Sequence, residues 1–115
     1  GDGIRIAKLF PLSQFYDYTK VIKRAYQDLP ANYHITLSYS EADMKYADEV
    51  VMAVVKTGVN MAVVFRDKLP DTFRGLQVID GDKDDLRFLD PKGVVVGLLA
   101  KGRAKKDTSG FVIDA

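Results

Sequence analysis

Residues 34–65 read HITLSYSEADMKYADEVVMAVVKTGVNMAVVF, and this stretch decides the fold. It opens with HITLSY (34–39), in which apolar and polar side chains alternate as they do along a strand with one buried face. It closes with MAVVF (61–65), an unbroken apolar run that is typical of a strand covered on both faces of a parallel sheet. We therefore predict two neighbouring parallel strands joined by a right-handed helical crossover.

The connection between these strands carries signals for the start and the end of a helix. Ser40 followed by Asp43 predicts a capping box, in which the hydroxyl accepts an exposed backbone amide and the acid reaches back. Lys56 suits the negative end of the helix dipole, and Gly58 can adopt the left-handed C-terminal cap. Apolar residues at helical spacing predict a buried stripe, formed by Ala47, Val50, Val51 and Val54.

A similar unit is expected upstream. Residues 14–18 (QFYDY) are short and rich in aromatic side chains, which favours a strand. Residues 20–29 gather apolar side chains on one helical face, and Pro30 prevents the helix from continuing. The alternation of strand and helix predicts an α/β fold with a mainly parallel sheet, built from repeated βα units in a single domain over residues 1–115.

The pattern changes after Phe65. We expect a polar loop at residues 66–75 and then three short strands, at residues 76–79, 86–89 and 94–99. Pro91 and Gly93 stand where a reverse turn favours them, so the last two runs predict a C-terminal β-hairpin. A final extended piece is expected at residues 111–113.

Composition excludes several classes of site. The 115 residues contain no Cys, so disulfides, thiolate zinc sites, iron–sulfur clusters on Cys ligands and Cys nucleophiles are ruled out. No apolar run is long enough to cross a bilayer and no signal-peptide pattern is present, so we expect a soluble, cytoplasmic protein without membrane contact. The first residue is Gly rather than Met, which suggests a processed product, a tag remnant or a piece of a longer chain.

Candidate ligand-binding residues follow the predicted strands. In an open parallel sheet, ligands bind beyond the carboxyl ends of the strands, where loops and helix N-termini meet. These ends carry donors, acceptors and cations that could hold a small anionic or nucleotide-like ligand, namely Tyr18, Lys20, Ser38, Ser40, Glu41 and Arg66. The alternative is that Ser40 only caps the helix and that the others are solvated loop residues. The phosphate-loop motifs GxGxxG and GxxxxGK[ST] are both absent from the sequence, which argues against nucleotide hydrolysis of the common kind.

The densest acidic cluster lies in VIDGDKDDLRFLD (78–90). Asp80 and Asp82 stand at alternate positions and could hold Mg²⁺ or Ca²⁺, although the run departs from a calcium loop at its expected Gly and Glu positions. The alternative is a solvated turn that is salt-bridged to Arg87 and to lysines near the C-terminus.

The run KGRAKK (101–106) could neutralise nucleic-acid phosphates. The formal net charge of the chain is only +1, which argues against a dedicated nucleic-acid binder and favours a frayed, soluble edge.

Three segments carry a family resemblance: FYDYTK (15–20), NYHITLSYSE (32–41) and residues 78–102. They resemble an uncharacterised family of phage- and plasmid-borne proteins, whose longer relatives look like radical-SAM-type half-barrels with a Cys-containing N-terminal part. The resemblance implies the C-terminal half of such a barrel and a phage or mobile-element origin, hence the cytoplasm of a host cell. It implies no catalytic residue, and cluster chemistry cannot be carried over to a chain without Cys.

Two functions follow from these expectations. The first is a small-molecule site at the carboxyl ends of the strands, either purely binding or enzymatic. The second is a non-catalytic module that forms oligomers or binds a host protein, because an open barrel half exposes strand edges that proteins normally cover.

Overall fold

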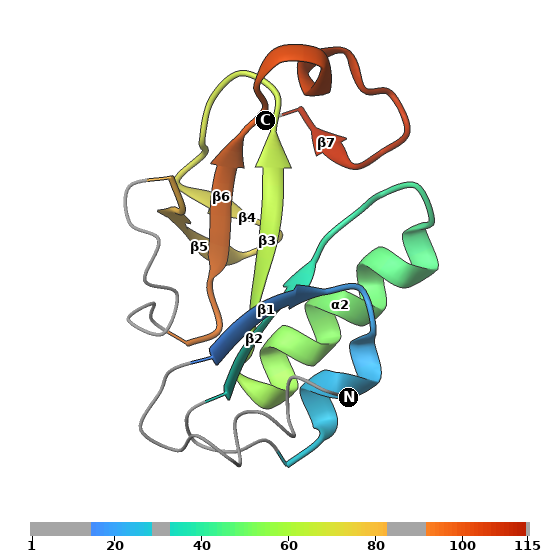
Figure 1. Cartoon of the computed structure of the whole chain (residues 1–115), viewed down its shortest axis with the longest axis vertical. Helices are drawn as coiled ribbons and strands as arrows, with labels where there is room; N and C mark the ends of the chain where they lie inside the picture. Colours follow the sequence, from blue (N-terminus) through green and yellow to red (C-terminus); the bar gives the residue numbers. More distant parts are fainter. Residues whose placement is uncertain (1–14, 29–32, 83–91, 115) are drawn as a thin grey trace.

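The computed structural model describes residues 15–28, 33–82 and 92–114. In this part of the chain, seven strands form one sheet in the order β1-β2-β3-β6-β5-β4, with β7 paired to β3 (Figure 1). The strands are β1 (Phe15–Thr19), β2 (Tyr33–Ser38), β3 (Asn60–Phe65), β4 (Thr72–Phe73), β5 (Leu76–Asp80), β6 (Val95–Leu99) and β7 (Val112–Ile113). All pairings are parallel except that of β4 with β5. The prediction of an α/β fold with a mainly parallel sheet is confirmed.

The central β-α-β unit agrees with the prediction. Helix α2 (Met44–Thr57) connects β2 to β3, and Gly58 ends it in the left-handed conformation with φ 80°. Its N-cap is Asp43, whose carboxylate accepts the Lys45 amide, so the predicted capping box at Ser40 is wrong. Ser40 instead accepts the Ala42 amide in a tight turn, which delays the start of the helix.

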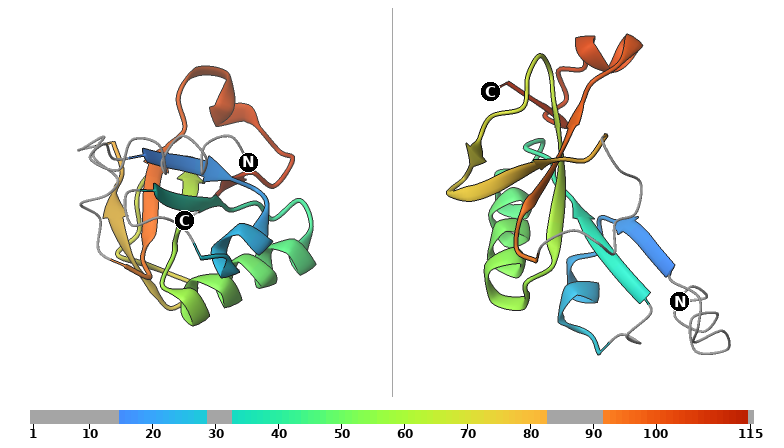
Figure 2. Two further views of the ribbon diagram at one scale, coloured as in Figure 1. Left: turned by 60° about the horizontal axis from the view of Figure 1, so that its bottom comes forward. Right: turned by 90° about the vertical axis from the view of Figure 1, so that its left-hand side faces the viewer.

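The core lies between α2 and one face of the sheet. Ala47, Val50, Ala53 and Val54 of the helix are buried against side chains of three central strands, Leu37, Met61, Val63, Phe65 and Val95. A shorter 3-10 helix, η1 (Ile22–Tyr26), adds Ala25 to the same core and lies beside α2 (Figure 2). The connections from β1 to β2 and from β2 to β3 thus place their helices on the same face of the sheet.

The helix predicted at residues 20–29 is wrong in length and type. Only η1 forms, because the chain is extended on both sides of it, at Val21 and Gln27. The Thr19 hydroxyl accepts the Val21 amide at 3.1 Å, so this amide is bonded locally where a longer helix would begin. The apolar run at residues 4–10 lies outside the described residues.

The predicted C-terminal hairpin is also wrong. Strand β6 lies between β3 and β5 and is parallel to both, so both of its edges are occupied over Val95–Gly97. Its expected partner at residues 86–89 lies outside the described residues. The hairpin that does form joins β4 to β5 through the two-residue turn Arg74-Gly75. Strand β4 and the turn lie in the segment expected to be a polar loop, whereas β5 confirms the strand expected at residues 76–79. The half-barrel and the strict repeat of βα units are not confirmed.

The basic run at residues 101–106 contains the 3-10 helix η3 (Gly102–Lys106). Among the described residues, no helix combines the length and the apolar character that crossing a membrane requires.

Candidate functional site

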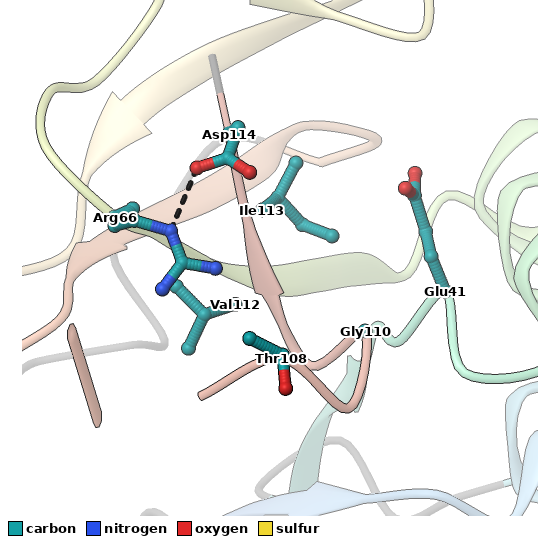
Figure 3. A pocket seen from close by; sticks show the side chains of 7 residues that line it. All are labelled: Glu41, Arg66, Thr108, Gly110, Val112, Ile113 and Asp114. Atoms are coloured by element: carbon teal, nitrogen blue, oxygen red, sulfur yellow. Dashed lines mark hydrogen bonds and ion pairs between the residues drawn. The ribbon is translucent and has the colours of Figure 1, made fainter. Parts of the chain in front are cut away.

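A pocket of about 400 Å³ lies at the carboxyl ends of the strands, where the chain leaves β2 and β3 and where β7 ends (Figure 3). Its wall consists of Glu41, Arg66, Thr108, Gly110, Val112, Ile113 and Asp114. This is the edge of the sheet at which ligand sites of parallel α/β proteins are found.

The strand pairing explains why the sheet is hollowed here. Strand β2 pairs with β3 only as far as Ala62, and β7 pairs with the same edge of β3 at Val64 and Phe65. After Ser38 the chain leaves the sheet toward α2. Strand β7 then pairs with the part of the β3 edge that β2 does not reach. The pocket therefore has one wall from the loop after β2 and another from β7 and the segment that precedes it.

Arg66 fixes the second wall. Its Nε donates to Asp114 Oδ1 at 2.7 Å, its Nη2 donates to the Asp107 carbonyl at 2.8 Å, and its Nη1 donates to the Lys105 carbonyl. The Arg66 amide donates to the Ile113 carbonyl at 2.9 Å. The guanidinium thus holds η3, β7 and the loop between them to the end of β3.

Gly110 brings the two walls together. The Glu41 amide donates to the Gly110 carbonyl at 2.7 Å. Gly110 has φ 104°, and a Cβ atom placed there would lie 2.6 Å from the Glu41 carbonyl carbon and closer still to the Ala42 nitrogen. Only glycine fits this position, because both its backbone angle and the contact with residues 41–42 exclude a side chain.

The Glu41 carboxylate is oriented by a chain of hydrogen bonds. Glu41 Oε2 accepts from the Tyr39 hydroxyl at 2.6 Å, and that hydroxyl accepts from Arg74 Nη1 at 3.0 Å. Arg74 Nη2 in turn pairs with Asp48 Oδ1 at 2.6 Å. The pKa of the fully buried Tyr39 is raised to about 12, first by its burial and then by its hydrogen bond to Glu41, while the bond from Arg74 acts in the opposite direction. Tyr39 therefore stays protonated and remains a donor to Glu41.

Arg74 reaches this network from an unusual backbone position. It has φ 51°, the one positive value among the described non-glycine residues, and Gly75 follows with φ 79°. Positive φ at both central residues is the geometry of a type I′ hairpin turn. Phe73, before the turn, packs edge-on against Tyr39 and Phe65 at 5.4 Å, so ring packing and the ion pair hold the hairpin against the core.

The structure brings two of the six predicted ligand-binding residues into this pocket, Glu41 and Arg66. The other four do not line this pocket. The Ser38 carbonyl accepts the Tyr46 hydroxyl at 2.5 Å, Ser40 stabilises its own turn, and Lys20 Nζ lies 5.7 Å from the centre of the Phe111 ring. Tyr18 is 43% exposed on β1. A binding role for these six residues stays a prediction.

Asp80 ends β5, and Asp82 lies in the turn that follows it. Asp80 Oδ1 accepts the Asp82 amide at 3.0 Å, and Asp82 accepts the Leu99 amide at 3.2 Å, with Lys101 Nζ at 3.9 Å. No group of three or more potential metal ligands occurs within the described residues, so the Mg²⁺ or Ca²⁺ site at this turn stays a prediction.

Sequence reasoning missed Thr108, Gly110 and Asp114. They become part of the site only because a two-residue strand near the C-terminus pairs with β3, which brings Asp114 to Arg66, 48 residues earlier in the chain. The apolar pair Val112-Ile113 was the one local signal for that strand.

These features define a small α/β protein with a mostly parallel sheet and a polar pocket at the carboxyl edge. A family model described as Gene product 88 matches residues 2–115. The chain therefore belongs to the Gene product 88 family, a family of phage gene products. No curated protein and no solved structure matches the chain. The phage part of the resemblance is confirmed, whereas nothing in these comparisons shows a likeness to radical-SAM proteins.

Proposed function

We propose that the protein binds a small polar molecule in the pocket at the carboxyl ends of β2, β3 and β7. The observation that carries the proposal is the convergence of Glu41, Arg66 and Asp114 on one cavity of about 400 Å³. That volume lies within the range of small-molecule and cofactor sites. Its walls are held by Gly110 and Arg66, which supports a site that is formed before a ligand arrives.

The charges of the lining favour a ligand with hydrogen-bond donors. Arg66 is ion-paired with Asp114, so Glu41 contributes the uncompensated charge of the lining residues. The Glu41 carboxylate uses one oxygen to accept from Tyr39, and its other oxygen can accept from a ligand hydroxyl, amine or base amino group. This preference adds hydrogen-bond donors to the small anionic or nucleotide-like ligand expected from the sequence.

Arg66 allows the same ligand to carry an anionic group. A guanidinium has five N–H donors, and the described contacts of Arg66 use three of them. The remaining donors, on Nη1 and Nη2, could bind a carboxylate or phosphate, although the paired Asp114 weakens the attraction. A nucleotide, with base donors at one end and phosphate at the other, would satisfy both sides of the pocket.

A thermal-shift screen tests the proposal, because a ligand that binds only the folded state raises the Tm. The panel is AMP, GMP, glucose, putrescine and MgCl₂, each tested on the natural chain and on Glu41→Gln. Glutamine still accepts from Tyr39 but lacks the charge, so we expect a ligand that stabilises the natural chain to lose most of its shift in this variant. Asp71→Asn removes an exposed charge away from the pocket and should leave the shift unchanged. Failure of every compound, or equal shifts in Glu41→Gln, would contradict the proposal.

A second candidate function is an interaction module without chemistry of its own. The observation that favours it is the apolar outer face of α2, where Met44, Met52 and Val55 are more than half exposed.

A further inference from the structure

The outer face of α2 presents apolar side chains to solvent. Met52 is 52% exposed and Val55 is 69% exposed, although both belong to the helix whose opposite face builds the core. At 3.6 residues per turn these two side chains lie on neighbouring turns of one face. Monomeric proteins rarely expose several apolar residues together, so such a face indicates contact with another molecule.

Charged side chains flank this apolar pair, and one of them, Asp48, stands one turn before Met52 and is ion-paired with Arg74. Glu49 and Lys56 are exposed, and they stand seven residues apart, which places them two turns apart on the same side of α2. Within the part of the chain that the structure describes, neither has an ion-pair partner. Along one border of the apolar strip, a negative group, Glu49, thus lies nearer the N-terminus of α2 and a positive group, Lys56, nearer its C-terminus.

This arrangement is complementary to itself. A two-fold axis that crosses the outer face of α2 at the level of residues 52–53 lies midway between Glu49 and Lys56 along the helix. Two copies of α2 packed antiparallel about this axis bring the same border of each helix together, so Glu49 of each copy meets Lys56 of the other. Met52 and Val55 then pack between the helices, as apolar residues do at the seam of paired helices.

We propose that α2 is a self-association surface, on which a second copy of this chain docks antiparallel through Met52 and Val55, with two reciprocal Glu49–Lys56 ion pairs. A two-fold interface uses the same patch on both subunits, and a patch whose charges match after rotation fits a second copy better than an unrelated partner. One helix face per copy is a small interface, so the dimer is weak and forms with rising concentration. The inference is independent of the ligand pocket, which lies at the edge of the sheet.

Sedimentation velocity over a concentration series tests this inference. The natural chain should shift from monomer toward dimer as its concentration rises. Glu49→Lys and Lys56→Glu each place like charges opposite one another in both reciprocal pairs, so each should weaken the dimer at least about tenfold. The double variant Glu49→Lys/Lys56→Glu exchanges the charges and restores the reciprocal pairs, so dimerisation should return.

Lys45→Glu is the matched control. It reverses an exposed charge on the same border of α2, but Lys45 lies outside the helix overlap and should not affect the dimer. Met52→Glu should abolish association while leaving the fold intact, because the side chain is on the surface. A natural chain that stays monomeric at the highest concentration reached would overturn the proposal. So would a dimer that the single reversals leave unchanged, or one that the double variant fails to restore.

Discussion

Arg66 Nε donates to Asp114 Oδ1 at 2.7 Å, an ion pair that joins the end of β3 to the end of the described chain 48 residues later. Together with the two carbonyls that Arg66 also binds, this pair makes the C-terminal segment part of the candidate site. The sequence predicted that Arg66 binds a ligand. In the structure, its hydrogen bonds hold the C-terminal wall of the pocket in place, and we call this set of bonds the clamp.

Replacing Arg66 by lysine should loosen this wall. Lysine keeps the positive charge but cannot reach three separate acceptors in one plane. We expect a loss of about 1–3 kcal/mol in the free energy of unfolding, since two carbonyls lose a charged donor. Hydrogen exchange at residues 110–113 should accelerate more than exchange in α2. Arg103→Lys, an exposed change on η3, serves as the control, and equal effects of both substitutions would refute the clamp.

Gly110→Ala should destabilise the protein more than Gly102→Ala. Both glycines have positive φ, so alanine strains the backbone at either position, by about 1 kcal/mol. Nothing lies within 4 Å of a Cβ atom at Gly102, whereas one at Gly110 collides with the backbone of residues 41–42. Urea denaturation should show the larger loss for Gly110→Ala, and similar losses would show that the close approach to Glu41 is unimportant.

Stability should fall in alkaline solution through Tyr39. Its pKa is raised from 10.0 to about 12 in the folded protein, so the unfolded chain loses its proton first as the pH rises. The contribution of Tyr39 to the free energy of unfolding is intact below pH 10 and falls by roughly 1.4 kcal/mol per pH unit up to about pH 12. Urea midpoints measured across this window should decline more steeply for the natural chain than for Tyr39→Phe. Parallel declines would mean that another group causes the loss.

Two substitutions at Arg74 separate its strain from its contacts. Arg74→Ala and Arg74→Gly both remove the bonds to Asp48 and Tyr39, but only glycine is relaxed at φ 51°. The glycine variant should therefore be the more stable of the two by about 1 kcal/mol, as measured by urea denaturation. An alanine variant of equal or greater stability would mean that the turn is not strained.

The central β-α-β unit could be predicted because each of its signals is local. These signals are the alternation at residues 34–39, the apolar stripe on α2 and Gly58 at its end. Each of them can be recognised from residues that are close together in the sequence. The helix start was misplaced because Ser40 and Asp43 are both good caps, and which one caps depends on where the chain leaves β2.

The hairpin at Arg74-Gly75 was missed because its first strand is only two residues long and its turn uses arginine where asparagine or glycine is usual. The expected hairpin around residues 90–93 failed for a different reason. Turn residues indicate that a chain reverses, but only the whole sheet decides that β6 is inserted between β3 and β5.

The sequence indicated where in the fold a site would lie better than it indicated which residues would line it. The rule that parallel strands collect ligand groups at their carboxyl ends selected Glu41 and Arg66, which both line the pocket, and their binding role stays a prediction. This rule could not identify Thr108, Gly110 or Asp114. They reach the site through the pairing of β7 with β3, and a strand of two residues is too short to show a periodic pattern in the sequence.

The most direct test of the binding proposal is a titration of ¹⁵N-labelled protein with the compound that gives the largest thermal shift, followed by amide chemical-shift mapping. Saturable changes should cluster at Glu41, Arg66 and residues 108–114, with little change along the outer face of α2. Changes that scatter over the surface, or that concentrate away from the carboxyl ends of β2, β3 and β7, would contradict a ligand site in this pocket.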